Sequence, residues 1–171
     1  MMKQLKSLLI AALLFAGASQ AVSAQAKVSH INVQELMTNM PEMKAANAQL
    51  EKLGKTYDTE YETMVTEYQN KIKKYDAEAN TVGEAVNKTR EAEVQDMRTR
   101  IQQYQQTATT ELQKKQEEIV KPILEKARTA IQKVAKAKGY QYVLDSSTGS
   151  GVLLADGPDL LADVKKELGF K

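Results

Sequence analysis

The residue types that most often carry out catalysis are sparse and scattered in this chain. His30 is the only histidine and there is no cysteine, so neither a nucleophile with an imidazole base nor a cluster of zinc-binding side chains can be assembled. The adjacent carboxylates Glu117 and Glu118 would point about 100° apart on a helix and are expected to lie in solvent. The chain is therefore predicted to be no enzyme and to need neither a metal nor a cofactor. His30 is expected to be a half-buried residue of a strand.

The run Gly149-Ser150-Gly151 is the one segment that could suggest a phosphate loop. It lacks the spacing of the phosphate-binding fingerprints, and no helix start follows it directly. We interpret it as a turn between two strands.

The first 24 residues have the pattern of a secretory signal peptide. Lys3 and Lys6 precede an apolar run, and small residues end it at Ala24, where we expect cleavage, with Ala26 as the second choice. The whole chain has 24 basic and 22 acidic residues, and residues 1–24 contain those two lysines and no acid. The rest of the chain therefore has 22 basic and 22 acidic residues. A balanced chain without a concentrated basic patch predicts no nucleic-acid partner.

The segment from Pro41 to Gly139 predicts a long helical hairpin. Between these two residues lie only two glycines, Gly54 and Gly83, and one proline, Pro122, while apolar residues recur in an eleven-residue repeat that predicts nearly straight helices. The repeat runs through Leu50, Leu53, Tyr57, Tyr61, Met64, Tyr68, Ile72, Tyr75 and Ala79, and resumes after Gly83 at Val94, Met97 and Ile101. Gly83 therefore predicts a turn near residues 80–84. Each limb of such an arm is about 55 Å long.

Folding about this turn pairs the two limbs and defines a base. Met64 is expected to meet Ile101, and Tyr57 to lie over Ala108. Pro122 then falls close to Pro41. Because proline removes a backbone hydrogen bond and usually kinks a helix, Pro41 and Pro122 are predicted to form a hinge at the base of the arm, which spans residues 41–122.

The two ends of the chain predict a small β body, residues 25–40 and 123–171. Val28 to Val33, Tyr140 to Asp145 and Gly151 to Ala155 have strand character, and a final amphipathic helix is expected from about Pro158 to Leu168. Three short strands are marginal alone and leave open edges, so the body is predicted to self-associate. The side chains expected at the contact are Ile31, Val33, Tyr142, Leu144, Val152 and Leu154.

Tyrosines and methionines along the arm could bind apolar partners, but their periodicity favours the seam between the limbs. Met40 and Tyr104 lie at the margin of the repeat or outside it. These two residues are the candidates for an exposed, client-facing surface.

Taken in order, the strand, the long hairpin, the two strands and the short helix resemble the Skp (OmpH-like) family of periplasmic chaperones. The similar residues are Ile31, Asn32 and Val33 with Leu36, the run from Gly139 to Asp145, and the run from Asp159 to Val164. The family commonly has a helix-capping threonine where this chain has Leu161, so Asp156 or Asp159 is expected to supply the cap.

The resemblance implies a mainly α fold in which the short strands of three chains join into one β body, and helical arms project from it like tentacles. It implies a periplasmic, ATP-independent holdase that keeps unfolded outer-membrane proteins in the cavity between the arms. Members of the family are often basic, whereas this chain is balanced once residues 1–24 are removed, so binding to lipopolysaccharide or a membrane surface is expected to be weak. The alternative is a structural coiled-coil adaptor of the cell envelope, which would bind one folded partner.

Overall fold

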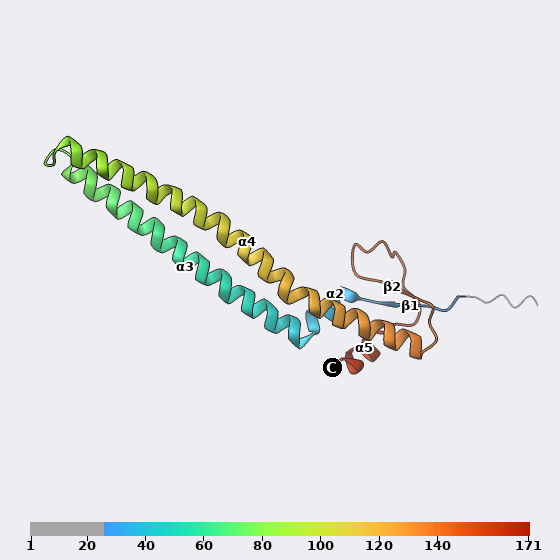
Figure 1. The fold of residues 1–171 in the computed structure, drawn as a ribbon. Helices are drawn as coiled ribbons and strands as arrows, with labels where there is room; N and C mark the ends of the chain where they lie inside the picture. The colour runs from blue at the N-terminus through green and yellow to red at the C-terminus, as the bar shows by residue number, and fades with distance from the viewer. Residues whose placement is uncertain (1–25) are drawn as a thin grey trace, which may run out of the picture.

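The computed structural model describes residues 26–171 and consists of a long helical arm on a small body (Figure 1). The predicted signal peptide, residues 1–24, lies outside the described residues and stays a prediction. In chain order the elements are β1 (Val28–Ile31), α2 (Val33–Asn39), α3 (Pro41–Glu78), α4 (Glu84–Ala137), β2 (Tyr142–Asp145) and α5 (Leu161–Glu167). Within these residues no helix has both the length and the apolar character needed to cross a membrane.

Helices α3 and α4 run side by side in opposite directions and form the arm (Figure 1). The chain reverses at residues 79–83, and Gly83 stands directly before α4. Met64 and Ile101 line one shared cavity between the helices, and Tyr57 and Ala108 line another, as the eleven-residue repeat predicts. The predicted mainly α fold, with a long antiparallel hairpin and a small β body, is thus confirmed for the single chain.

The two prolines lie at the base of the arm but do not interrupt it. Pro41 is the first residue of α3, where its missing N–H costs nothing. Helix α4 continues through Pro122 to Ala137. Glu42, one residue after Pro41, and Lys126, four residues after Pro122, form an ion pair that joins the two helices there. A hinge at this level stays a prediction.

The sheet of the body is smaller than the sequence predicts. Strands β1 and β2 pair in parallel, from Val28 opposite Tyr142 to Ile31 opposite Asp145. The other edge of β1 is held by the segment before α5, where His30 N–H donates to Pro158 O at 3.0 Å and Leu160 N–H donates to His30 O at 3.0 Å. The prediction of a strand at Gly151–Ala155 is wrong for the single chain, because no strand lies beside this segment to complete its hydrogen bonds.

Val33, predicted to end the first strand, instead begins the short helix α2. Asn32 caps this helix, since its Oδ1 accepts the Glu35 N–H at 2.8 Å. An asparagine three residues before a glutamate is a helix-start signal. This pair of residues is the feature of the sequence from which α2 could be predicted.

The core lies where the base of α4 packs on the body. Ile31, Leu36, Met40, Leu160 and Val164 are essentially without exposure. They pack against the last four turns of α4, through Ile123, Ala127, Ala130 and Val134. Burial of this apolar surface is the main stabilising term of the body. The C-terminal part of α4 therefore belongs to the body, and only the rest projects as the arm.

Helix α4 ends at a left-handed glycine, Gly139. Gly139 has φ +74°, Tyr140 N–H donates to Ala135 O at 2.9 Å and Gly139 N–H donates to Lys136 O at 3.1 Å. This double hydrogen bond is the Schellman motif, which needs a left-handed residue. Leu160 occupies the N-cap position of α5 and makes no side-chain cap hydrogen bond, and Asp159, the residue before it, accepts the Leu161 N–H through Oδ1 at 2.9 Å.

Candidate functional site

Two of the residues singled out from the sequence lie inside the body. Met40 has no exposed surface and belongs to the core, so the prediction that it faces clients on an exposed surface is wrong. Ile31 is 1% exposed and packs within its own chain. Its side chain cannot contact a second copy while this core is intact. Both errors have one cause: the sequence does not show that α5 and the base of α4 cover these positions.

Tyr104 lies in the seam of the arm and not on an exposed inner face. Its ring meets that of Tyr57 edge to face, with 6.4 Å between centroids and planes at 70°. Its hydroxyl donates to Glu60 Oε2 at 2.7 Å. Burial, followed by this hydrogen bond to a carboxylate, raises the pKa of Tyr104 to about 12. Tyr104 lies outside the apolar repeat of its own helix, yet it packs against Tyr57, which belongs to the repeat of the other helix.

The remaining predicted contact residues stay at the surface of the body. Tyr142 is 60% exposed, Leu144 45% and Leu154 82%, whereas Val33 and Val152 are half-buried. Leu153, which the sequence analysis did not single out, is fully exposed. A group of large apolar side chains left in water marks an interaction surface more often than a scatter of single ones does.

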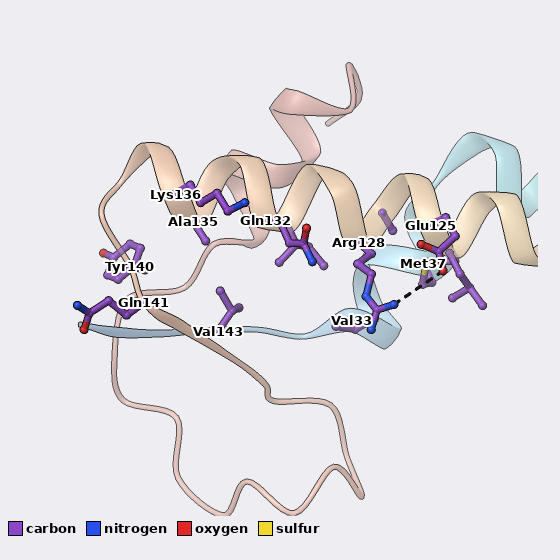
Figure 2. A pocket seen from close by; sticks show the side chains of 13 residues that line it. Val33, Met37, Glu125, Arg128, Gln132, Ala135, Lys136, Tyr140, Gln141 and Val143 are labelled. Atoms are coloured by element: carbon purple, nitrogen blue, oxygen red, sulfur yellow. Dashed lines mark ion pairs between the residues drawn. The ribbon is translucent and has the colours of Figure 1, made fainter. Parts of the chain in front are cut away.

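A groove on the body lies between α4 and the sheet (Figure 2). Its volume is about 650 Å³, and its floor is mostly apolar, formed by Val33, Met37, Leu124, Ala127, Ile131 and Val143. Polar side chains stand at the rim, where Glu125 and Arg128 form an ion pair at 3.8 Å. Val143 of β2 points towards α4 (Figure 2), so its neighbours Tyr142 and Leu144 face the opposite side of the sheet.

The free edge of β2 runs along this region. Within residues 26–171 the sheet has the order β1–β2, so nothing pairs with the outer edge of β2. Backbone groups at such an edge can receive another strand. We use the term body surface for the groove, the open edge and the exposed leucines taken together, without implying one continuous face: Leu124, Ile131, Tyr142, Val143, Leu144, Leu153 and Leu154.

A polar cluster fixes the start of the loop that carries these leucines. Asp145 Oδ1 accepts Ser147 Oγ–H at 2.5 Å, Ser147 N–H at 2.9 Å and Val33 N–H at 3.3 Å. Burial raises the pKa of Asp145, but these hydrogen bonds outweigh it and hold that pKa below its usual range. Ser147 Oγ also accepts the Gln34 N–H at 3.0 Å, so the cluster ties the end of β2 to the first turn of α2.

His30 has a structural environment. Its Nδ1 lies 3.2 Å from Ser146 Oγ and its Nε2 lies 3.0 Å from Gly157 O. One ring nitrogen thus binds the beginning of the 146–157 loop and the other binds its end. Among the described residues no cluster of three histidine, cysteine, aspartate or glutamate side chains is placed to hold a metal ion.

The arm has a thin seam. Of residues 47–122, none is buried, because two helices alone cover only one stripe of each other. Polar contacts join the helices near the tip, where Arg90 Nη2 lies 2.5 Å from Glu78 Oε2 and the Arg90 guanidinium lies 4.5 Å from the Tyr75 ring centroid. The arm therefore offers a long, accessible surface held by few enclosed side chains.

The match to a family model covers residues 27–168 and is to the family described as outer membrane protein (OmpH-like). That range takes in both strands, the whole arm and α5. The chain belongs to the OmpH-like family. Because the match includes the small body as well as the helices, OmpH-like membership does not depend on the coiled-coil composition of the arm.

Curated relatives of this OmpH-like chain have the name chaperone protein Skp. The protein from Pectobacterium atrosepticum is 26% identical over 151 residues, with 88% of this chain and 90% of the relative covered. The protein from Yersinia enterocolitica is 29% identical over 164 residues, with 95% and 98% covered. The protein from Photorhabdus laumondii is 30% identical over 145 residues, with 84% and 88% covered.

A solved structure has the same fold. It is the crystal structure of a putative outer membrane chaperone (OmpH-like) from Caulobacter crescentus, with a TM-score of 0.75, 21% identity and 85% of each chain covered. The arm and body of this OmpH-like chain are therefore arranged as in a protein solved independently.

Proposed function

We propose that this protein is a periplasmic, ATP-independent holdase chaperone that binds unfolded outer-membrane proteins. The observation that carries the proposal is the joining of a long, thinly packed arm to a small body in a chain matched almost end to end by proteins named chaperone protein Skp. Delivery to the periplasm would depend on the predicted signal peptide, residues 1–24.

The arm suits this task because its surface is long and its seam is weak. With no buried residue between 47 and 122, bending the arm disrupts few enclosed contacts, and segments with few buried contacts open and move most readily. A hinge at Pro41 and Pro122 would let the whole arm swing at its base. Several weak contacts along such arms would hold an unfolded chain and still let it leave.

We further propose that the body assembles three copies through the body surface. A segment of a second copy that contains Leu153 and Leu154 would add to the open edge of β2 as a strand. Successive side chains of a strand face opposite sides, so one leucine would enter the groove beside Val143 while the other covers Tyr142 and Leu144. This pairing would give Gly151–Ala155 the strand structure that the single chain lacks.

Charge is expected to contribute little to client capture. The chain has 22 basic and 22 acidic residues after position 24, and several lysines of the arm are already paired, as Lys55 is with Glu51 at 2.7 Å. We therefore expect weak binding to lipopolysaccharide or to an anionic membrane surface, and a small effect of salt on client binding.

The decisive experiment is an aggregation assay. A urea-unfolded outer-membrane barrel protein is diluted into buffer with the chain from residue 25 onwards, without ATP, and light scattering is followed. Suppression at equimolar assembled chaperone is expected, and a folded barrel protein that does not bind is the control. If aggregation proceeds unchanged at a molar excess, the chaperone proposal is wrong. Crosslinking that recovers one folded envelope protein would then favour the coiled-coil adaptor.

Assembly is tested separately by replacing both exposed leucines of the loop with serine. Leu153→Ser with Leu154→Ser is expected to shift sedimentation from trimer to monomer at micromolar concentration, while the circular dichroism of the arm is retained. Val86→Ser is the matched control, because Val86 is an exposed apolar residue at the tip of the arm. A double variant that stays trimeric would refute this contact, and a monomeric parent chain would refute the trimer.

A further inference from the structure

The segment that carries Leu153 and Leu154 is held only at its two ends. Leu153 is fully exposed and Leu154 is 82% exposed. Within the part of the chain that the structure describes, residues 151–156 make no hydrogen bond. The position of the two leucines therefore depends on what fixes the chain directly before and directly after these residues.

The start of the segment has several independent attachments. Ser150 Oγ–H donates to Asp145 O at 2.6 Å, and Ser150 N–H donates to Ser147 O at 3.1 Å. Ser147 is itself held by the side chain of Asp145. His30 adds a further contact here through Nδ1, which lies 3.2 Å from Ser146 Oγ. Loss of that one contact would leave the start of the segment in place.

The end of the segment depends on His30. The carbonyl oxygen of Gly157 lies 3.0 Å from His30 Nε2. Glycine has wide conformational freedom, and a Cβ added at Gly157 would meet nothing within 4 Å, so packing does not restrict its backbone. The next hydrogen bond along the chain joins His30 N–H to Pro158 O. The His30 ring is thus what fixes the glycine that joins the leucine segment to the sheet.

The ring of His30 also lies on a defined face of the sheet. His30 is paired with Leu144 in the parallel register, so the two side chains point to the same face. Val143 points towards α4 (Figure 2), and the His30 ring and Leu144 therefore lie on the face away from α4. That is the face on which we propose that one leucine of a second copy covers Tyr142 and Leu144. The ring links the leucine loop to the sheet face that assembly would cover.

The two contacts determine the tautomer of the neutral ring. A carbonyl oxygen only accepts hydrogen bonds, so Nε2 of His30 carries the hydrogen that binds Gly157 O. Nδ1 then accepts the hydroxyl hydrogen of Ser146. Both ring nitrogens have a partner, and the ring is fixed between the start and the end of the loop.

We propose that His30 is a positioning residue for self-association: by fixing Gly157 it holds Leu153 and Leu154 in the arrangement that a second copy receives. The inference rests on the proposed assembly through the body surface. A loop that is already ordered loses less conformational entropy when it binds, and such preorganisation strengthens association. One net hydrogen bond corresponds to a factor of about five, so loss of this order at all three contacts of a trimer lowers its formation constant about a hundredfold.

Assembly is the first test, by sedimentation over a range of concentrations. An asparagine side chain is too short to reach Gly157 O, whereas a glutamine amide can donate to it. His30→Asn should therefore lower the trimer formation constant about a hundredfold, and His30→Gln should retain most of it. Ser146→Ala is the matched control, because it removes only the Nδ1 contact, and its effect should be less than about threefold. Equal effects of His30→Asn and either of the other two changes would overturn the proposal.

A second change in the His30→Asn variant separates loop order from the stability of the strand. Gly157→Ala restricts the loose backbone without a clash. It should recover about tenfold of the lost formation constant, from about twofold at each of three contacts. Gly54→Ala likewise fills open space, but in the arm, and should recover none. Absence of recovery by Gly157→Ala, or equal recovery by both changes, would contradict the role of His30.

The order of the loop is measured without assembly in the variant with Leu153→Ser and Leu154→Ser. Order parameters of residues 151–156 from nitrogen relaxation should fall when His30→Asn is added and stay unchanged when His30→Gln is added. Unchanged loop order in His30→Asn, with a parent chain that is trimeric, would overturn the His30 proposal alone. A monomeric parent chain would overturn the assembly and, with it, the part of His30 in assembly.

The tautomer gives an independent readout on the parent chain. His30 is the only histidine, so its two ring nitrogens can be assigned in long-range proton–nitrogen spectra. In alkaline solution, where a histidine ring is ordinarily neutral, the hydrogen is expected on Nε2. A hydrogen on Nδ1 would exclude the bond to Gly157 O and overturn the proposal.

Discussion

Replacing Met40 by alanine tests whether this side chain stabilises the core or binds clients. Met40 has no exposed surface and lies at the junction between α2 and α3, in the core formed with Ile31, Leu36, Leu160 and Val164. Alanine removes three heavy atoms from an enclosed site, and such changes cost about 2–5 kcal/mol, with the upper part of the range for sites that cannot collapse. The body is small, so this loss is a large share of the 5–15 kcal/mol typical of a whole domain.

The assay is urea unfolding followed by circular dichroism at one fixed protomer concentration, because assembly contributes to apparent stability. Met97→Ala is the matched control: it removes the same atoms from a half-buried position in the seam of the arm, and we expect its cost to be about 1 kcal/mol, in proportion to the smaller burial. Client binding by Met40→Ala should fall only as far as the folded fraction falls.

The opposite pattern would refute the assignment of Met40 to the core. If Met40→Ala left the midpoint of unfolding unchanged and weakened client binding, Met40 would face clients as the sequence first indicated. A midpoint shift equal to that of Met97→Ala would also contradict the argument, since it would show that complete burial of Met40 adds nothing.

Three further changes test other parts of the structure. Asn32→Ala removes the cap that accepts the Glu35 N–H at 2.8 Å and should lower the free energy of unfolding by about 1 kcal/mol, whereas Asn32→Ser should retain most of it. The pKa of Tyr104 is raised to about 12, so its contribution to the free energy of unfolding is complete below the ordinary tyrosine pKa of about 10 and is lost as the pH rises to about 12. Tyr104→Phe should therefore remove this part of the loss of stability in denaturation curves recorded between these pH values. A variant with the same pH profile as the parent chain would contradict the argument. Gly139→Ala forces an alanine to φ +74° and should cost about 1–2 kcal/mol, measured by thermal unfolding, with Gly54→Ala as a control that is expected to stabilise.

Most of the arm could be predicted because its determinants are local. The eleven-residue repeat, Gly83 after Asn80 and Thr81, and the absence of other breakers set the helices and the register in which Met64 meets Ile101. Tyr104 was misplaced because a repeat describes one helix face at a time. Its contact with Tyr57 and Glu60 depends on how far the two helices are rotated towards each other.

The body was predicted less well because its contacts join distant parts of the chain. Strand character at Gly151–Ala155 is a local property, but a strand exists only where another strand completes its hydrogen bonds. Within one chain the edge of β1 is taken by Pro158 to Leu160. The strand predicted for residues 28–33 hides the start of α2, because Asn32, whose side chain caps this helix at the Glu35 N–H, lies within that segment.

The sequence by itself determined the long hairpin, its turn, the position of its base and the resemblance to the OmpH-like family, since helix periodicity and helix-ending residues act within a few positions of one another. The tertiary structure decided which apolar residues are enclosed and which remain in water: Met40 and Ile31 are buried in the core, while Leu153 and Leu154 stay exposed. Burial depends on which segments are brought over a residue from far along the chain, and no local pattern contains that information.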